Sequence, residues 1–350
     1  MTAAAPLDLL VMGGTRFMGR AVVERALARG HRVTIVHRGS HRSDFDSPVT
    51  EVLGDRSDPA TLSALRALGD RFDAVVDLSA YGAEQTRALC AALPDVPRFV
   101  HVSTGAVYAP QPTFPWPESS PLGPAPLWGG YAREKLACEA ALRELRGERG
   151  VTWALRLPYV LGPRNYAPRE EFVLNRLLDG AELLLPGGGA ALIQFADVTQ
   201  VGAACIALAE RPPAPALAPA APADAAPADA APADAAPAAS GFQPLNVATT
   251  ELVSLAGFVA LCAEVARTPV RTRPVGGGPT GTGNDVFDAA DCVFPFPNDS
   301  YVLDVARLAA LGLDLPEVSV REMIARALTA LRADPERRRW RRTEAEKTWL

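Results

Sequence analysis

Cysteine and histidine are scarce in this chain of 350 residues, which holds five of the former and four of the latter. The cysteines show no C-x-x-C spacing, and the histidines show no spacing typical of metal ligands. We therefore expect reduced cysteines in the core and no metal site. These residues are Cys90, Cys138, Cys205, Cys262 and Cys292, and His31, His37, His41 and His101.

Positive charge is not in excess either. The 35 Lys and Arg residues face 40 Asp and Glu residues, which gives a formal net charge of -5. Because nucleic-acid binding usually needs a basic face, this balance argues against a nucleic-acid partner. One basic cluster lies at residues 337–342, and we interpret it as a solvated terminal helix within a basic tail, residues 335–350.

Long apolar runs are also missing. No uncharged apolar stretch approaches the roughly 18 residues that a membrane-spanning helix needs. The N-terminus reaches its first strand within a few residues and has no pattern typical of a signal peptide. We therefore expect a cytoplasmic protein with no membrane partner.

One segment lacks large side chains almost entirely. From Pro212 to Ala239 the chain is nearly all Ala, Pro and Asp, and the unit A-A-P-A-D occurs three times between Ala220 and Asp234. Proline at every fifth residue prevents a stable helix, and the composition cannot offset the entropy of ordering. Residues 212–241 are therefore predicted to be a disordered linker, inserted between a helix and a strand of an otherwise intact fold.

Alternating strand and helix patterns fill the first 160 residues, which predicts an α/β fold with a parallel sheet. The first strand, Leu7–Met12, leads into a glycine-rich loop and a helix that ends near Arg29. Such a loop lets backbone amides approach a pyrophosphate at a helix N-terminus, so it predicts a dinucleotide site. The loop residues are Gly13, Gly14, Thr15, Arg16, Phe17, Met18 and Gly19.

The cofactor type is indicated by the end of the second strand, residues 32–36. His37 and Arg38 follow it, where an acidic residue would accept hydrogen bonds from the ribose 2′-hydroxyl of NAD. Arg38 suits a 2′-phosphate instead, and Arg16, which replaces the middle glycine of a G-x-x-G-x-x-G loop, can assist. NADP(H) is therefore favoured, and NAD(H) remains open if Arg38 is only a solvated loop residue.

Further cofactor candidates lie at the ends of later strands. Asp55, followed by Arg56, is placed to accept from an adenine amino group, or it only turns the chain. Leu78, Ser79 and Ala80 end the strand that begins at Phe72, and the small residues there let a cofactor pass. The strand Phe99–Thr104 ends in a hydroxyl side chain.

Tyr131 and Lys135 form the pattern that carries the chemistry. Four residues apart on a helix, the phenol and the ammonium share one face. A nearby positive charge favours the phenolate and so lowers the pKa of a tyrosine from about 10. Tyr131 can then exchange a proton with an alcohol or ketone near neutral pH. An isolated Y-x-x-x-K spacing arises often by chance, but the dinucleotide loop and Thr104 give this one a context.

These residues resemble the extended short-chain dehydrogenases/reductases, in particular the nucleotide-sugar epimerase and dehydratase group. The segments that carry the resemblance run in family order from about residue 7 to residue 312. They include residues 102–108, 131–135, 156–163, 194–198 and 245–248. The resemblance implies a Rossmann-like doubly wound sheet with a smaller C-terminal α/β lobe that covers the substrate.

The resemblance also implies roles for single residues. Thr104 would bond the reacting oxygen, Tyr131 would exchange its proton, and Lys135 would tune Tyr131 and hold the nicotinamide ribose. The backbone of Tyr159 and Val160, after Pro158, would face the carboxamide. Asn165, Arg176 and Gln194 are candidates for the sugar or diphosphate, and each is equally a candidate for an ordinary surface residue.

The residues after Thr104 narrow the reaction. Family members that dehydrate sugars resemble one another in an Asp-Glu pair at these positions, and decarboxylating members in a Glu at the second. Here Gly105 and Ala106 stand there, and neither can act as an acid or base. A 4,6-dehydratase is therefore disfavoured, which leaves a 4-epimerase and a ketoreductase or dehydrogenase as alternatives, acting on a sugar and most simply on a nucleotide sugar.

A second class of function stays open. The Gly-Gly-Thr-Arg-Phe opening resembles a branch that includes chloroplast stem-loop RNA-binding proteins, so an RNA-binding protein on the same scaffold is the alternative. The expected domains are 1–160 for the cofactor and 161–334 for the substrate, with 190–211 and 242–250 returning to the first. A homodimer that pairs through helices 85–93 and 135–145 is also expected.

Overall fold

The structure is a computed structural model that describes residues 5–68, 71–123, 128–147, 149–167, 169–212, 241–276 and 292–349. The predicted linker at 212–241 falls almost wholly outside the described residues. This prediction therefore remains untested.

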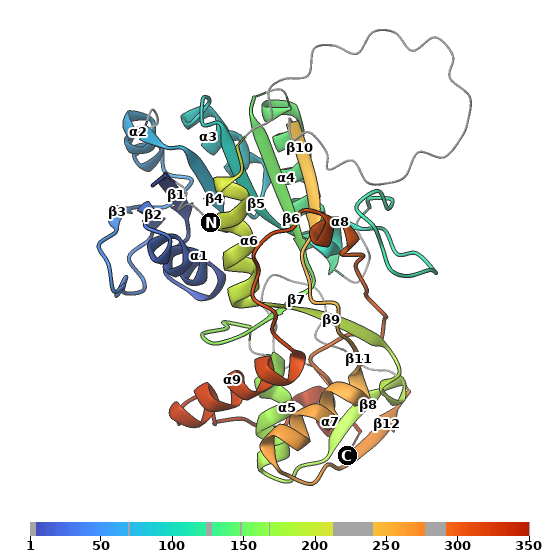
Figure 1. Cartoon of the computed structure of the whole chain (residues 1–350). Coiled ribbons are helices and arrows are strands. Elements are labelled where there is room, and N and C mark those ends of the chain that lie inside the picture. Colours follow the sequence, from blue (N-terminus) through green and yellow to red (C-terminus); the bar gives the residue numbers. More distant parts are fainter. Residues whose placement is uncertain are drawn as a thin grey trace, which may run out of the picture.

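A seven-stranded parallel sheet forms the larger part of the molecule (Figure 1). The strand order is β10-β6-β5-β4-β1-β2-β3. From the centre of the sheet, β1, β2 and β3 follow one another to one edge, and β4, β5, β6 and β10 follow one another to the other edge, as in a doubly wound fold. The predicted Rossmann-like sheet is thereby confirmed. The strands are β1 (Asp8–Met12), β2 (Arg32–His37), β3 (Thr50–Leu53), β4 (Ala74–Asp77), β5 (Arg98–Thr104), β6 (Val151–Leu157) and β10 (Gly241–Asn246).

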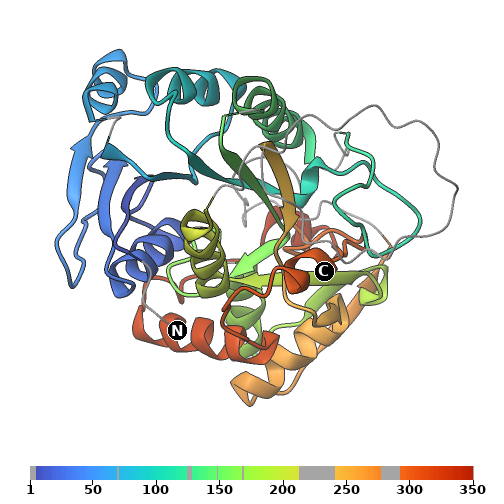
Figure 2. The same ribbon diagram turned by 45° about the horizontal axis from the view of Figure 1, so that its top comes forward.

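Helices cover both faces of this sheet (Figure 2). α1 (Phe17–Ala28) and α6 (Val198–Glu210) pack side by side on one face, and α2 (Pro59–Leu68), α3 (Ala83–Ala92) and α4 (Gly129–Arg146) cover the other. Successive residues of a strand point to opposite faces. In β1, Leu9 and Val11 accordingly enter the core beside α1 and α6, whereas Leu10 and Met12 enter the core beside α2 and α3.

A smaller lobe lies beyond the carboxyl ends of the strands and has its own apolar core (Figure 1). It contains α5 (Arg169–Leu178), α7 (Leu255–Ala266) and α9 (Val320–Ala333). Two small sheets accompany these helices, with orders β11-β9-β7 and β12-β8. Their strands are β7 (Tyr159–Leu161), β8 (Leu183–Pro186), β9 (Leu192–Asp197), β11 (Leu252–Ser254) and β12 (Thr272–Val275).

The structure moves two of the expected domain boundaries. β9 pairs with β7 and β11, so the segment that returns to the large sheet begins with α6 at Val198 and not at residue 190. The short helix α8 (Ala306–Ala310) packs on β10, and Leu308 and Leu311 enter the core of the larger part, although 306–311 was assigned to the substrate lobe. In both cases a contact between segments distant in sequence decided the position: strand pairing for β9 and apolar packing for α8.

The basic tail is not the solvated helix that was predicted. It packs on the smaller lobe, and its only described helix is the four-residue α10 (Glu344–Lys347). Hydrogen bonds hold it on the lobe: the Trp340 Nε1 donates to Asp179 at 2.7 Å, and Arg342 donates to the backbone carbonyl of Glu182 at 2.8 Å. Four tail arginines form ion pairs: Arg337 with Glu171, Arg338 with Asp179, Arg339 with Glu336, and Arg342 with Glu346.

Three expectations concern the cysteines, the metal ligands and the membrane-spanning helices of the described part of the chain. All five cysteines are buried free thiols, as expected of core residues. Within the ranges given above, no three His, Cys, Asp or Glu side chains converge in a way that would hold a metal ion. None of the described helices is both long and apolar enough to cross a bilayer.

Candidate active site

The loop between β1 and α1 has the geometry of a phosphate cradle. Gly13 takes a φ of 91°, and a Cβ on Gly19 would lie 2.0 Å from the carbonyl oxygen of Gly13, so only glycine fits there. α1 begins without a side-chain cap and without an acidic residue in its first turn. Its first backbone amides are therefore not occupied by a carboxylate of their own turn, and the helix dipole favours an anion.

A first pocket, here called the adenosine pocket, extends from this loop across the ends of β2 and β3. Eight of the residues predicted to bind the cofactor line it: Gly13, Thr15, Arg16, His37, Arg38, Asp55, Arg56 and Ser79. Residues that the sequence did not single out also line it, among them Ser40, His41, Tyr81 and Gln85. Arg38 and Asp55 are exposed, and Arg16 lies over the ring of Tyr166 at 5.3 Å.

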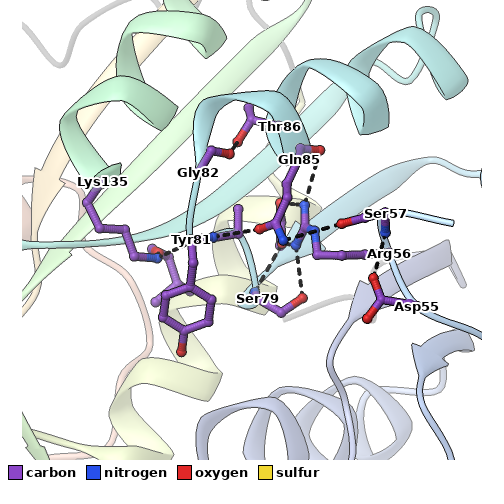
Figure 3. Close-up of polar contacts among 12 residues, drawn as sticks. Asp55, Arg56, Ser57, Ser79, Tyr81, Gly82, Gln85, Thr86 and Lys135 are labelled. Atoms are coloured by element: carbon purple, nitrogen blue, oxygen red, sulfur yellow. Dashed lines mark hydrogen bonds and ion pairs between the residues drawn. The ribbon is translucent and has the colours of Figure 1, made fainter. Parts of the chain in front are cut away.

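A buried ion pair forms the floor of the adenosine pocket. Arg56 donates to both carboxylate oxygens of Asp77, at 2.6 and 2.9 Å, and to the Oγ of Ser79 at 2.9 Å. Figure 3 shows the guanidinium of Arg56 between Ser79 and Gln85. Burial alone would raise the pKa of Asp77, but the charge and hydrogen bonds of Arg56 outweigh burial and lower the pKa to about 2. The sequence analysis missed Asp77, although an acid inside an apolar strand signals a buried partner.

A second pocket, here called the nicotinamide pocket, adjoins the first, and Tyr81 lines both. Thr104 from β5 and Tyr131 from α4 face this pocket together with Pro158, Tyr159 and Val160. Phe17, Met18 and Asn165 also line it, so the structure gathers most of the predicted site in one cleft. Unpredicted members include Ala106, Trp128, Leu157, Tyr166, Arg169 and Tyr301.

Lys135 lies below the surface of this cleft, with 3% of its area exposed. Its ammonium donates to the carbonyl oxygens of Ala80 and Val102, at 2.8 and 3.0 Å, at the ends of β4 and β5. The ring of Tyr81 lies over the ammonium at 5.1 Å, and Figure 3 shows this approach from α4. The cation is thereby fixed one helical turn after Tyr131.

Thr104 and its neighbours are held tightly. The Oγ1 of Thr104 accepts from the backbone amide of Ala106 at 3.2 Å and so caps the short helix Gly105–Val107. A Cβ on Gly105 would lie 1.6 Å from the hydroxyl oxygen of Tyr301. Any side chain at position 105 would therefore have to displace Tyr301, which is buried against Tyr108, Trp116 and Leu303.

Some predicted site residues do not line either pocket. Gly14 packs against Val23 and Ile35, and Gly19 against Gly13. Leu78 and Ala80 are not among the residues that line the two pockets. Arg176, which was a candidate for substrate contact, instead forms a buried ion pair with Glu346, at 2.7 and 2.8 Å. Gln194, the other such candidate, bonds the backbone of Thr249 and Leu303. Both side chains support the smaller lobe, and we do not retain them in the substrate site.

A third pocket, here called the aromatic pocket, opens beside the nicotinamide pocket, with which it shares Trp128 and Tyr301. It has a volume of about 550 Å³. The remaining residues that line it are Tyr108, Pro110, Gln111, Phe114, Trp116, Pro297, Asn298, Asp299 and Ser300. This pocket was not predictable from local patterns, because its two walls lie far apart along the chain.

A buried carboxyl group supports the far wall of the nicotinamide pocket. Glu170 has 1% of its area exposed and accepts from the Nδ2 of Asn165 at 3.4 Å. Burial raises the pKa of Glu170 to about 8, and the neighbouring carboxylate of Glu171 adds to the shift. Glu170 is therefore protonated in the folded protein at neutral pH.

This raised pKa makes stability depend on pH. The unfolded chain ionises Glu170 near pH 4.5, while the folded protein keeps its proton up to about pH 8. The contribution of Glu170 to the free energy of unfolding is therefore most favourable below pH 4.5. It falls as the pH rises to 8, because the unfolded chain then binds fewer protons than the folded protein. Glu170→Gln cannot ionise, so we expect it to be more stable than the unchanged protein at pH 8, by on the order of 1 kcal/mol. Urea unfolding at pH 5.5 and pH 8 measures this, with the exposed Glu84→Gln as control; equal pH slopes for all three proteins would contradict it.

The sequence model of the NAD dependent epimerase/dehydratase family matches residues 9–216, which is more than half of the chain. The chain belongs to this family. The family match runs from β1 through α6, so it includes every strand of the large sheet except β10, together with Thr104, Tyr131 and Lys135. The expected family is thereby confirmed.

Two curated relatives of this epimerase/dehydratase chain are similar over part of their length. A chloroplast stem-loop binding protein of 41 kDa from Arabidopsis thaliana is 30% identical over 219 residues, 58% of this chain and 55% of that protein. A 2′-dehydrokanamycin reductase from Streptomyces kanamyceticus is 31% identical over 137 residues, 39% of this chain and 38% of that protein. The chain thus matches about half or less of the length of these relatives.

Solved structures of sugar epimerases share the fold of this family member. A UDP-N-acetylglucosamine 4-epimerase from Methanobrevibacter ruminantium has a TM-score of 0.70 and 18% identity, over 94% of this chain and 99% of that one. A UDP-glucose 4-epimerase from Thermotoga maritima, solved with UDP-glucose, has a TM-score of 0.67 and 19% identity, over 93% and 99%. A UDP-glucose 4-epimerase from Thermus thermophilus, solved with NAD, has a TM-score of 0.66 and 21% identity, over 93% and 99%.

Proposed function

We propose that this protein is an NAD(P)-dependent enzyme that transfers hydride to or from a sugar carbon, with Tyr131 as the proton relay. The observation that carries the proposal is the position of Tyr131 and Thr104 on one wall of a pocket that joins a phosphate cradle through Tyr81. Family membership and the sugar epimerases of the same fold support it. The reaction is a 4-epimerisation or the reduction or oxidation of a keto or hydroxyl group.

The residues present fit a nicotinamide dinucleotide. The cradle at Gly13 and Gly19 and the uncapped start of α1 suit its diphosphate, and Arg56 and Asp55 border the space for its adenosine. Tyr159 and Val160 border the nicotinamide end. When bound, the nicotinamide supplies or accepts the hydride.

Residues of this chain bind the reacting substrate oxygen and exchange its proton. Thr104 and Tyr131 both face the pocket, so a substrate oxygen placed between them can accept a hydrogen bond from one hydroxyl and exchange a proton with the other. The ammonium of Lys135, fixed by two carbonyl oxygens, keeps a positive charge below this point. A cation there favours the anionic form of whichever oxygen has lost its proton.

Dehydration is disfavoured in the proposal. It needs an acid and a base beside the reacting sugar, and positions 105 and 106 offer neither. The hydroxyl of Tyr301 fills the space that a side chain at position 105 would require. These positions therefore favour hydride and hydroxyl-proton transfer.

Labelled cofactor separates the two reactions. A reductase is expected to transfer one deuterium from 4-deuterated NADPH or NADH to each product molecule, with equal oxidation of the cofactor. An epimerase returns the hydride to the same sugar, so it is expected to leave the free cofactor unoxidised and the product unlabelled. Mass spectrometry of the product together with absorbance at the reduced nicotinamide band reads both. Sugar products that form without either pattern would contradict the proposed chemistry.

Preference for NADP(H) is part of the proposal. Arg38 is exposed at the rim of the adenosine pocket near Arg16, and no acidic residue follows β2 directly. We expect Arg38→Ala to raise KM for NADPH by about 10- to 100-fold, the value of a charge-assisted hydrogen bond, and to leave KM for NADH unchanged. Arg42→Ala, an exposed neighbour that does not line the pocket, is the matched control. An NADPH preference that survives Arg38→Ala would refute the assignment.

The substrate class rests on the relatives. The resemblance predicts a nucleotide sugar, and solved structures of the same fold hold UDP-glucose or UDP-N-acetylmuramic acid. One curated relative is instead named a 2′-dehydrokanamycin reductase. We therefore propose a sugar as the substrate at this stage. The homodimer and the cytoplasmic location remain predictions.

RNA binding is not favoured as an alternative. Its support is the similarity to the stem-loop binding protein over 58% of this chain. Against it, four arginines of the basic tail are engaged in ion pairs with acids of the lobe or of the tail itself. RNA phosphates could bind these arginines only if the ion pairs broke. A protein with a net charge of -5 also does not attract the negatively charged phosphates.

A further inference from the structure

The aromatic pocket is the cavity beside Tyr131 that the cofactor cleft does not use. Trp128 and Tyr301 line both it and the nicotinamide pocket. A substrate whose reacting carbon lies at Tyr131 and Thr104 has this cavity next to it for the rest of the molecule. Its chemistry therefore indicates what the substrate carries beyond the reacting sugar carbon.

None of the described residues that line the aromatic pocket carries a positive charge. The walls come from residues 108–128 and 297–301. The sequence has no Lys, Arg or His anywhere from 109 to 132 or from 274 to 306. A diphosphate carries a full negative charge on each phosphate and is recognised by arginine, lysine or several helix amides. The start of α4 at Gly129 offers about half a positive charge, which does not replace them.

The arginine of the neighbouring pocket is already committed. The guanidinium of Arg169 lies 5.3 Å from the ring of Tyr159 and 6.0 Å from that of Phe296. It also donates to the carbonyl oxygen of Pro295 at 2.6 Å. This cation therefore braces the wall behind the nicotinamide pocket and does not supply charge to the aromatic pocket.

What the aromatic pocket does contain suits a saccharide. Trp116 is buried between Phe114 and Tyr301, with ring centroids 5.3 and 5.6 Å apart, whereas Phe114 is 40% exposed and Trp128 is half-buried. Accessible aromatic faces of this kind stack on apolar ring surfaces and attract ammonium groups. Among the described residues that line this cavity, Asp299 alone is charged, and its charge is negative.

Two donors at the cavity walls lack partners. The Nε2 of Gln111, in the aromatic pocket, and the hydroxyl of Tyr159, in the nicotinamide pocket, are buried and have no hydrogen-bond partner among the described residues. A buried donor without an acceptor is costly, so such groups point to a ligand that supplies one. Sugar hydroxyl oxygens meet this need without bringing charge.

We propose that the substrate is an amine-bearing glycoside without phosphate groups, held by the aromatic pocket with an ammonium group facing Asp299. The proposal rests on the proposed function and narrows its substrate. It replaces the nucleotide sugar expected from the resemblance with a sugar that the charges of this chain can hold.

Binding measurements test this without requiring turnover. Four probes are titrated into the full-length protein, saturated with NADP+ and separately with NAD+, by calorimetry: the glucosamine disaccharide, its di-N-acetyl form, UDP and UDP-glucose. We expect the amine disaccharide to bind at least about tenfold tighter than the acetylated one, the equivalent of about 1.4 kcal/mol. UDP and UDP-glucose are expected to show no binding and no competition.

A substitution at the exposed Asp299 separates the contribution of charge to disaccharide binding from that of shape. Asp299→Asn is expected to reduce the tenfold preference for the amine to less than about threefold, without changing cofactor binding. Asp314→Asn, an exposed acid outside the pocket, is the control. Equal binding of the two disaccharides, or a preference unaffected by Asp299→Asn, would overturn the ammonium contact.

The titrations with UDP and UDP-glucose test whether the substrate lacks phosphate groups. Binding of UDP or UDP-glucose that the amine disaccharide competes away would overturn the proposal while leaving hydride transfer intact. Conversely, an amine glycoside that binds in this way but never exchanges hydride with the cofactor would leave this inference standing and refute the proposed function. The two failures are therefore distinguishable.

Discussion

Replacement of Tyr131 with phenylalanine is expected to reduce kcat by about 10²- to 10⁴-fold, the usual contribution of a positioned acid or base. The ring stays, so the packing of α4 against the pocket is kept, but the oxygen that exchanges the proton is gone. Cofactor affinity should change by less than about threefold, because the phosphate cradle and the adenosine pocket lie elsewhere. Steady-state kinetics with a sugar that the labelled-cofactor experiment shows to be turned over, and titration of cofactor fluorescence, measure the two effects.

Tyr166→Phe is the matched control for this result. Tyr166 lines the same pocket from the lobe, is 42% exposed and contacts Arg16 and Phe17 through its ring. Its loss of a hydroxyl should leave kcat within about threefold of the unchanged enzyme. Equal activity in both variants would remove Tyr131 from the chemistry, and a loss of cofactor binding in Tyr131→Phe would show a structural role instead.

Replacement of Arg56 with methionine is expected to destabilise the protein by about 3–5 kcal/mol, since it leaves the carboxylate of Asp77 buried without a counter-charge. The cost arises because Asp77 is fully buried and must either stay charged or take up a proton. The same change removes a wall of the adenosine pocket, so KM for the cofactor should rise as well. Urea unfolding at pH 7 and cofactor titration measure the two effects separately.

A surface ion pair on the same sheet provides the control. Arg32 and Asp8 also form a two-point pair, at 2.5 and 2.6 Å, but their side chains are 63% and 34% exposed. Arg32→Met should cost less than about 1 kcal/mol, because water solvates the remaining charge. The double variant Arg56→Met/Asp77→Leu is expected to be more stable than Arg56→Met alone. Similar losses in Arg56→Met and Arg32→Met would contradict the buried-charge explanation.

The position of the proposed catalytic residues was predictable from local patterns. Thr104 ends a strand, Tyr131 and Lys135 share a helix face, and the Gly13–Gly19 loop follows the first strand. Parallel strands bring their carboxyl ends to one edge of a sheet, so residues at those ends meet whatever the rest of the chain does. The prediction therefore needed neither loop lengths nor side-chain packing.

Arg176 shows where such reasoning stops. A basic residue on a helix of the substrate lobe looks the same in sequence whether it faces a ligand or an internal acid. Its partner, Glu346, lies 170 residues further on. Which carboxylate an arginine meets depends on how the tail packs on the lobe, and that packing has no local signature.

The sequence by itself determined the sheet, the cofactor loop and the hydroxyl, phenol and amine that gather beside it, because strand period, glycine positions and helix spacing act over a few residues. Tertiary structure alone decided the Arg56–Asp77 pair, the docked tail and the aromatic pocket. Each of these joins segments that are far apart along the chain, and the pocket in particular unites residues 108–128 with 297–301. Burial of apolar surface between such segments is a property of the folded whole, so it fixes contacts that no local pattern encodes.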